Sequence, residues 1–161
     1  MTLLRPFRPD DSAACLAIFD SNTPKFFAPQ ERDEFRSYLA SLGARSAPYL
    51  VLETDGVLRA CGGLEVAPDS GEVHLTWGMV DQTCHGQRLG TRLTEARLAL
   101  ARTLPGATRL ILSTSQHTQG FYARFGFTVN RITPDDFGPG LDRWDMALPL
   151  APPTAPPEIR A

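Results

Sequence analysis

The sequence predicts a single α/β domain built on a mixed, mostly antiparallel sheet, with helices on both faces and a central parallel strand pair. Two strand-like runs within 49–66 are separated by the turn Asp55-Gly56, which is typical of an antiparallel hairpin. A strand-like run over 72–80, a helix-like run over 90–103 and a short apolar run over 109–114 follow. Because a strand–helix–strand crossover joins parallel neighbours, the sheet is expected to be mixed.

Turn and cap residues divide the N-terminal half into its elements. Pro6 interrupts an edge strand, since proline cannot donate to a ladder. Pro9 starts a helix, and Gly43 is expected to end the next one. The elements expected here are an edge strand over 2–8, a helix from 9 to about 20, a loop over 22–29, a helix over 30–42, and the hairpin strands 49–53 and 58–66.

The C-terminal half continues from the turn 69–71 into the strand 72–80. The helix 90–103 is expected to carry its apolar face on Leu89, Leu93, Ala96 and Leu100. The remaining expected elements are a buried strand over 109–114, a short helix over 118–124, a strand over 127–132, a loop over 133–140 and a strand over 143–148.

Size and composition limit the possible functions. The chain has 161 residues, 42% hydrophobic and 21% charged, as expected for a globular protein with one core. The net charge of -2 argues against a general binder of nucleic acid or of membrane surfaces, so neither partner is expected. We expect one domain over 1–150, followed by a proline-rich, disordered tail over 151–161.

The cysteines indicate a reducing environment. Cys15, Cys61 and Cys84 are odd in number and have no metal-ligand spacing. The sequence also shows neither a signal peptide nor an apolar run of transmembrane length. These features predict a cytoplasmic protein that uses no metal.

The segment from His85 to Gly90 is the first functional signal. It lies between a strand and a helix and contains two glycines, Gly86 and Gly90. The first N–H groups of a helix have no internal partner and carry partial positive charge, so they bind anions. The full Gly-x-Gly-x-x-Gly motif of dinucleotide folds and the Gly-Lys-Ser/Thr ending of nucleotide P-loops are both missing. The turn therefore predicts a phosphorylated ligand of another kind.

A second block, Ser115 to Phe127, contains Phe-Tyr-x-x-x-Gly-Phe after a buried strand. Together with the turn it resembles the GNAT superfamily of acetyl-CoA-dependent N-acetyltransferases, so the sheet is expected to be GNAT-like. The family turn has Gln or Arg, two residues, Gly, one residue, then Gly or Ala. Those positions here are His85, Arg88 and Gly90. The chain departs from the family with His85, with Arg88 in place of Gly, and with Ser115 in place of the usual Asn.

The resemblance implies acetyl-CoA as co-substrate and no metal. It implies Tyr122 as the general acid near the CoA sulfur, because a phenol is protonated at neutral pH and can hydrogen-bond to a forming thiolate. Dimers are common in the family, so a homodimer is one possibility. The residues expected at the CoA site are Met79, Val80, His85, Gly86, Gln87, Arg88, Leu89, Gly90, Thr91, Ser115 and Tyr122.

The base and the acceptor remain open in the sequence. Glu72, His74 and Thr76 share one face of a strand, and His74 falls where some family members place a catalytic glutamate. His74 and Glu72 are thus candidate bases, although both also suit an ordinary polar strand face. Phe26, Phe27, Thr76 and Phe137 could shape the pocket of a small-molecule amine.

Two alternatives to acetyl transfer onto an amine are kept. One is a non-catalytic acyl-CoA-binding or sensing module, motivated by His85 and Arg88. The other is an acyltransferase that uses another acyl group or another acceptor.

Overall fold

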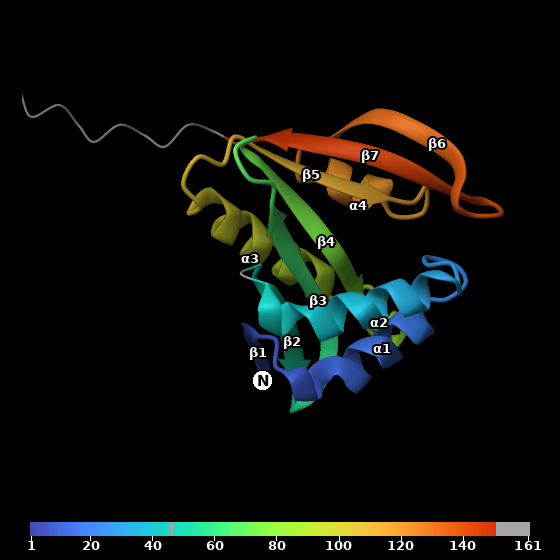
Figure 1. The fold of residues 1–161 in the computed structure, drawn as a ribbon. Coiled ribbons are helices and arrows are strands. Elements are labelled where there is room, and N and C mark those ends of the chain that lie inside the picture. The colour runs from blue at the N-terminus through green and yellow to red at the C-terminus, as the bar shows by residue number, and fades with distance from the viewer. Residues whose placement is uncertain (46, 151–161) are drawn as a thin grey trace, which may run out of the picture.

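One sheet organises the whole molecule (Figure 1). A computed structural model describes residues 1–45 and 47–150, and its seven strands follow the order β1-β2-β3-β4-β5-β7-β6. Every neighbouring pair is antiparallel except β4 and β5, which are parallel. The predicted α/β fold, with a mixed, mostly antiparallel sheet and one central parallel pair, is confirmed. The predicted disordered tail, 151–161, lies outside the described residues.

The strands are β1 (Thr2–Pro6), β2 (Tyr49–Thr54), β3 (Val57–Val66), β4 (Glu72–Val80), β5 (Arg109–Thr114), β6 (Thr128–Gly138) and β7 (Leu141–Pro149). The helices are α1 (Ser12–Ser21), α2 (Glu31–Ser41), α3 (Leu89–Arg102) and α4 (Gln119–Ala123), with short 3₁₀ turns over Pro9–Asp11, Leu42–Ala44 and Gln82–Cys84. Each predicted element is present with its ends shifted by three residues or fewer, apart from β6.

Helices cover both faces of the sheet and bury apolar clusters on each. On one face α1 and α2 pack against β2, β3 and β4 through residues such as Phe19 and Phe35. On the other face α3 and α4 contribute Leu98 and Tyr122 to a core with β4 and β5. Each fully buried side chain of this size stabilises the fold by about 1.5–3 kcal/mol. Among the described residues no helix is long and apolar enough to cross a membrane.

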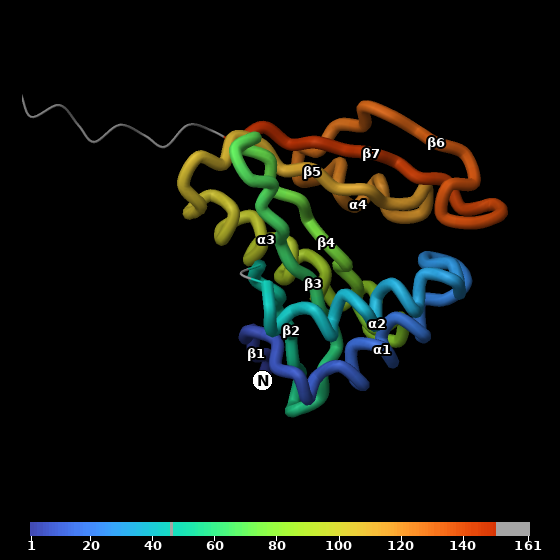
Figure 2. The backbone as a smooth tube through the Cα atoms, in the orientation of Figure 1, coloured from blue at the N-terminus to red at the C-terminus, as the bar shows by residue number. Residues whose placement is uncertain are grey.

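The parallel pair separates after a short contact, and this opens the sheet. Strands β4 and β5 pair only from Glu72 to His74, opposite Arg109 to Ile111. Beyond His74, β4 runs on to Val80 beside β3, whereas β5 follows β7. The two strands therefore diverge towards their carboxyl ends, as the tube in Figure 2 shows. Ligands of open α/β sheets bind where strands diverge in this way.

The segment predicted as a loop over 133–140 instead forms the end of a long hairpin. β6 continues to Gly138, and Gly138 pairs with Leu141 of β7. The turn formers produce a register shift between Thr133 and Gly138, with Asp135 at a φ of 55°. Hydrogen bonds of the Asp135 amide to Asp142 and of the Gly140 amide to Asp135 satisfy the irregular backbone. The prediction was wrong because local side-chain bonds can hold turn residues within a ribbon.

Candidate active site

A β-bulge in β4 marks the point where the sheet opens. Gly63 pairs with Thr76 and Cys61 with Met79, so Trp77 and Gly78 together oppose Gly62. Trp77 has a φ of 41°, which is rare for a bulky residue and persists only where the surroundings fix it. As a result the side chains of Thr76 and Trp77 both face α2, where the Thr76 hydroxyl bonds that of Tyr38 at 3.0 Å.

Side chains from both faces bind backbone carbonyls at the bulge. The Tyr49 hydroxyl donates to Trp77 O at 2.9 Å. From the opposite face Arg97 Nε donates to Gly63 O at 3.2 Å, and a second Arg97 nitrogen donates to Thr76 O at 3.4 Å. Arg97 is only 2% exposed and forms no ion pair with the described residues. The bulge is thus held from two sides.

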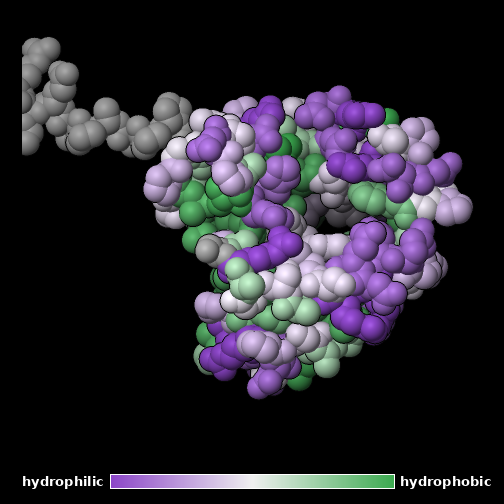
Figure 3. Space-filling view, viewed as in Figure 1, coloured by the Kyte–Doolittle hydropathy of each residue, from purple (hydrophilic) through white to green (hydrophobic). Residues whose placement is uncertain are grey.

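A cavity of about 980 Å³ runs through the opening between β4 and β5. The space-filling view shows the molecule hollowed between the β6–β7 hairpin and the α1–α2 side (Figure 3). Ten of the eleven residues predicted at the CoA site line this cavity, and Gln87 does not. Phe26, Phe27 and Phe137 line it as well, whereas Thr76 does not.

The turn that leads into α3, together with the first residues of this helix, forms one end of the cavity. Arg88 adopts a left-handed conformation with a φ of 63°, and α3 begins at Leu89. The N–H groups of Leu89, Gly90 and Thr91 have no acceptor among the described residues, as expected at a helix N-terminus. These three amides and the helix dipole suit a phosphate group. Glycine adopts this left-handed conformation without steric cost. This explains why the turn of the family that the sequence resembles has glycine where this chain has Arg88.

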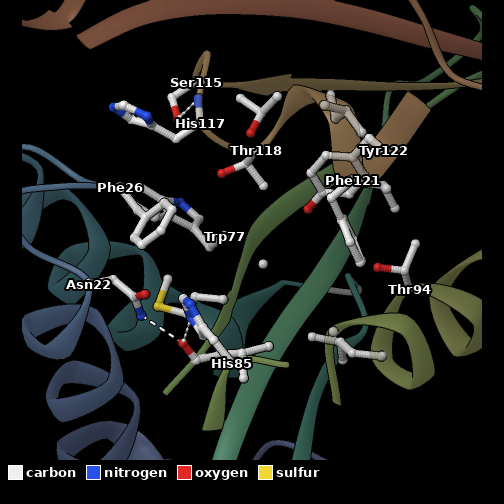
Figure 4. A pocket seen from close by; sticks show the side chains of 18 of the residues that line it. Asn22, Phe26, Trp77, His85, Thr94, Ser115, His117, Thr118, Phe121 and Tyr122 are labelled. Carbon is white, nitrogen blue, oxygen red and sulfur yellow. Dashed lines mark hydrogen bonds between the residues drawn. The ribbon is translucent and has the colours of Figure 1, made fainter. Parts of the chain in front are cut away.

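Tyr122 and Ser115 lie on the wall formed by β5 and α4 (Figure 4). Tyr122 is 9% exposed, and its hydroxyl has no hydrogen-bond partner in the described part of the chain. This hydroxyl is therefore available to a ligand. Ser115 Oγ accepts a hydrogen bond from the His117 amide at 3.3 Å, and its carbonyl accepts one from the Thr118 amide at 3.1 Å, so Ser115 also stabilises the turn that leads into α4.

Asn22, which the sequence analysis missed, and His85 meet at the carbonyl of Val80 (Figure 4). Asn22 Nδ2 donates to Val80 O at 2.8 Å, and His85 Nε2 lies 3.0 Å from the same oxygen. The His85 ring also stands edge-on to Phe26, with ring centroids 5.3 Å apart. Through this contact with Phe26, His85 connects the anion-binding turn to the segment that follows α1.

Aromatic side chains enclose the other end of the cavity. Trp77 stacks on Phe35 and Phe27, with ring centroids 5.0 and 6.2 Å apart. Phe26 stands edge-on to both His85 and His117. The α1–α2 segment and the β6–β7 hairpin meet where Gln30 Nε2 donates to Phe137 O at 3.2 Å. This contact joins the two segments beside the aromatic end of the cavity.

The two candidate bases lie away from the cavity. Glu72 forms an ion pair with Arg109 at the start of β4. His74 is exposed, with its Nε2 3.8 Å from Glu72 Oε2. Neither side chain lines the cavity. The alternation of β4 does put Glu72, His74 and Thr76 on one face, but the first two precede the point where β5 diverges.

The fold and the site define an acyltransferase of the class that moves acetyl groups onto amines. The model of the acetyltransferase (GNAT) family matches residues 15–127, and the chain belongs to this family. It is therefore a GNAT-type N-acetyltransferase, as the resemblance implied. No curated protein matches the chain.

Solved structures with the same fold cover nearly the whole chain. A proposed GNAT acetyltransferase from Desulfovibrio desulfuricans has a TM-score of 0.80 at 21% identity, covering 94% of this chain and 100% of its own. The ribosomal-protein-S18-alanine N-acetyltransferase of Escherichia coli has a TM-score of 0.77 at 20% identity, covering 96% and 99%. A proposed acetyltransferase from Salmonella typhimurium, solved with its cofactor acetyl-CoA, has a TM-score of 0.74 at 21% identity, covering 98% and 99%.

Proposed function

We propose that this enzyme transfers the acetyl group of acetyl-CoA directly to the amine of a small molecule. One observation carries the proposal: a single cavity joins the amides at the start of α3 that lack an acceptor among the described residues, the Tyr122 hydroxyl and a separate aromatic end. Such a cavity can hold a CoA thioester and an amine at the same time, on opposite sides of the opened sheet. Holding both reactants together supplies much of the rate enhancement of a bimolecular reaction.

The CoA arm would enter between α3 and α4. Its pyrophosphate would accept hydrogen bonds from the amides of Leu89, Gly90 and Thr91. Arg88, whose side chain is exposed at the same turn, can pair with a CoA phosphate. The pantetheine arm would then run past Val80 towards the bulge at Trp77, where β4 has no partner on its β5 side.

The reaction needs one bond made and one broken. The amine nitrogen attacks the thioester carbonyl carbon, the new C–N bond forms, and the C–S bond breaks to release the CoA thiolate. Tyr122 would donate its hydroxyl proton to the departing sulfur. This role is supported by its position in the cavity lining and by a hydroxyl that has no hydrogen-bond partner among the described residues. An ammonium first loses one proton to water and becomes the neutral, attacking amine. After the attack the nitrogen loses a second proton through water, and a proton from water restores the Tyr122 hydroxyl. A role for His74 or Glu72 in either transfer would require a water relay because neither lines the cavity.

A small acceptor is favoured by the closed shape of the aromatic end. Gln30 and Phe137 join the two segments that flank it, and a Cβ at Gly138 would lie 3.2 Å from the Ala28 side chain. An extended peptide would need these segments to part. A compact amine would not.

Two measurements on the purified chain test the proposal. Titration calorimetry should show acetyl-CoA binding, and a panel of small amines should cause release of free CoA. Absence of acetyl-CoA binding would reject the function. Binding without CoA release for any amine would instead favour a non-catalytic acyl-CoA-binding module, and release only with another acyl-CoA would identify a different acyl group.

A further inference from the structure

Asn22 presents an unused hydrogen-bond acceptor to the cavity. Its side chain is only 3% exposed. Its Nδ2 donates to two carbonyls, Ile18 O and Val80 O, each at 2.8 Å. Because carbonyls can only accept, the amide cannot be reversed, and Oδ1 must face away from them. Within residues 1–45 and 47–150 no donor reaches this oxygen, and Asn22 lines the cavity.

Because this oxygen is open to the cavity and has no donor among the described residues, a ligand that supplies an N–H can form a hydrogen bond there. Asn22 follows α1 and stands beside the end of β4, on the face of the sheet that carries Phe26 and Trp77 (Figure 4). The oxygen therefore belongs to the aromatic end of the cavity. It lies opposite the wall that carries the Tyr122 hydroxyl.

Charged residues are distributed unevenly along the cavity. Arg88 and Arg124 line it near the anion-binding turn and α4, and the buried Arg97 lines it at the bulge. At the aromatic end the charged lining residues are Glu31 and Glu34, and neither forms an ion pair with the described residues. Burial raises the pKa of Glu31, although the Ala28 amide donates to its Oε2 at 2.8 Å. A cation at this end would meet uncompensated negative charge.

The remaining wall is flat and apolar. Phe26, Phe27, Trp77 and Phe137 supply aromatic rings that can stack on a planar group or attract a cation to their faces. These rings suit an apolar body better than a polar or carboxylate-bearing one, and the polar groups beside them are the imidazoles of His85 and His117.

We propose that the acceptor is a primary ammonium compound with an aromatic or similarly flat apolar body, and that Asn22 Oδ1 accepts a hydrogen bond from its nitrogen. This rests on the acetyl transfer proposed above. The ammonium binds through Asn22 and the field of Glu31 and Glu34, and then loses one proton to water. The neutral amine keeps two N–H bonds, so one still donates to Asn22 while the lone pair attacks the thioester carbon.

The substrate class is tested on the wild-type enzyme with three probes. Phenethylamine has the ammonium and the ring, phenylalanine adds a carboxylate, and ethanolamine lacks the ring. We expect kcat/KM for phenethylamine to exceed both others by about tenfold or more, which corresponds to one or two lost favourable contacts. A higher kcat/KM for phenylalanine or for ethanolamine would overturn the proposed class.

The role of Asn22 is tested with two substitutions that separate the contribution of its Oδ1 from that of its Nδ2. Asn22→Ala removes Oδ1 and should raise KM for phenethylamine about tenfold, with the Kd of acetyl-CoA changed by less than about threefold. Asn22→Asp keeps an oxygen and adds attractive charge, so KM should stay near the wild-type value. Asn22→Asp loses both Nδ2 bonds, so its melting temperature should fall at least as far as that of Asn22→Ala.

If Asn22 only stabilises the fold, the KM values of the two variants should rank in the opposite order. KM for the amine would then rise at least as much in Asn22→Asp as in Asn22→Ala, and the Kd of acetyl-CoA would rise in parallel, which would overturn the proposal. If either variant does not fold, Glu34→Gln provides an independent test. It should raise KM for phenethylamine about two- to threefold at low salt and less at high salt, whereas Asp33→Asn, on the same helix but outside the cavity, should not. No change in Glu34→Gln would contradict the charge argument.

The outcomes also separate this inference from the proposed function. Acetyl-CoA binding with CoA release from amines of another class would reject the ammonium-and-ring acceptor and keep the acetyltransferase. Failure to bind acetyl-CoA at all would reject the acetyltransferase itself.

Discussion

The guanidinium of Arg97 fills the space above Gly78. A Cβ built at Gly78 or at Gly62 would lie 3.1 Å from Arg97 Cζ, closer than side chains normally approach. Both glycines belong to the bulge that opens the sheet, and the same guanidinium donates to carbonyls on both strands of the bulge. The bulge, the glycines and the buried arginine therefore form one structural unit beneath the proposed thioester site.

Adding a methyl group to this unit should destabilise the protein. Because Arg97 cannot move without breaking its bonds to Gly63 O and Thr76 O, Gly78→Ala and Gly62→Ala should each lower the free energy of unfolding by about 1–3 kcal/mol. Urea unfolding followed by circular dichroism measures this. Gly43→Ala is the matched control, since a Cβ there meets nothing within 4 Å. Equal stability of Gly78→Ala and Gly43→Ala would show that Arg97 moves freely.

Much of the fold could be predicted from local patterns. The strand-like run over 72–80 and the apolar spacing that begins at Leu89 predicted β4 and α3, because each pattern lies within one element. Leu89 and Leu93 are buried as expected, but Ala96 and Leu100 are only partly buried, and Arg97 is buried in their place. A guanidinium bound to bulge carbonyls breaks the apolar pattern on which the prediction relied.

The site was less predictable because it depends on where elements meet. The turn His85 to Gly90 could be recognised from a continuous motif. Asn22 could not, since an asparagine after a helix is also an ordinary turn residue and its partner Val80 is distant in sequence. The positions of Glu72 and His74 relative to the cavity depend on how early β5 leaves β4, which no local pattern encodes.

Arg88 combines a strained backbone with a charge, and two substitutions separate these properties. Glycine adopts the left-handed conformation of residue 88 without strain, whereas alanine is strained there as arginine is. Arg88→Gly should therefore be more stable than Arg88→Ala by about 1 kcal/mol. Both lose the guanidinium, so both should bind CoA more weakly and with less salt dependence than the wild type. Calorimetry at two ionic strengths measures this. Wild-type affinity in Arg88→Ala would show that the side chain does not contact the phosphates.

Removal of the Tyr122 hydroxyl should slow the reaction without loosening the cofactor. Tyr122→Phe should lower kcat about 100-fold, because the departing thiolate loses its proton donor. The Kd of acetyl-CoA should change by less than about threefold, since the ring and its packing remain. The matched control is Thr118→Val, which removes another hydroxyl from the same wall of the cavity and should leave kcat close to wild type. An unchanged kcat in Tyr122→Phe would remove Tyr122 from the mechanism.

The N-terminal strand is fixed by an ion pair that should make stability depend on pH. Arg5 donates to both oxygens of Asp11 at 2.8 and 2.9 Å, and this pairing lowers the pKa of Asp11 below its ordinary value of 3.8. A carboxyl with a lowered pKa stabilises the folded state above the ordinary value. That stabilisation is lost as the pH falls through the lowered pKa.

Asp11→Asn should therefore lower the free energy of unfolding by about 1–2 kcal/mol at pH 7, because the pair is only partly shielded from water. The difference from the wild type should shrink as the pH is lowered from about 4 towards 2, where the wild-type carboxyl becomes protonated. Asp10→Asn is the control, because Asp10 is exposed on the same turn and forms no ion pair with the described residues. Denaturant unfolding of the three proteins across this pH range measures the effect. A difference that stays constant down to pH 2 would show that Asp11 acts through packing and not through its charge.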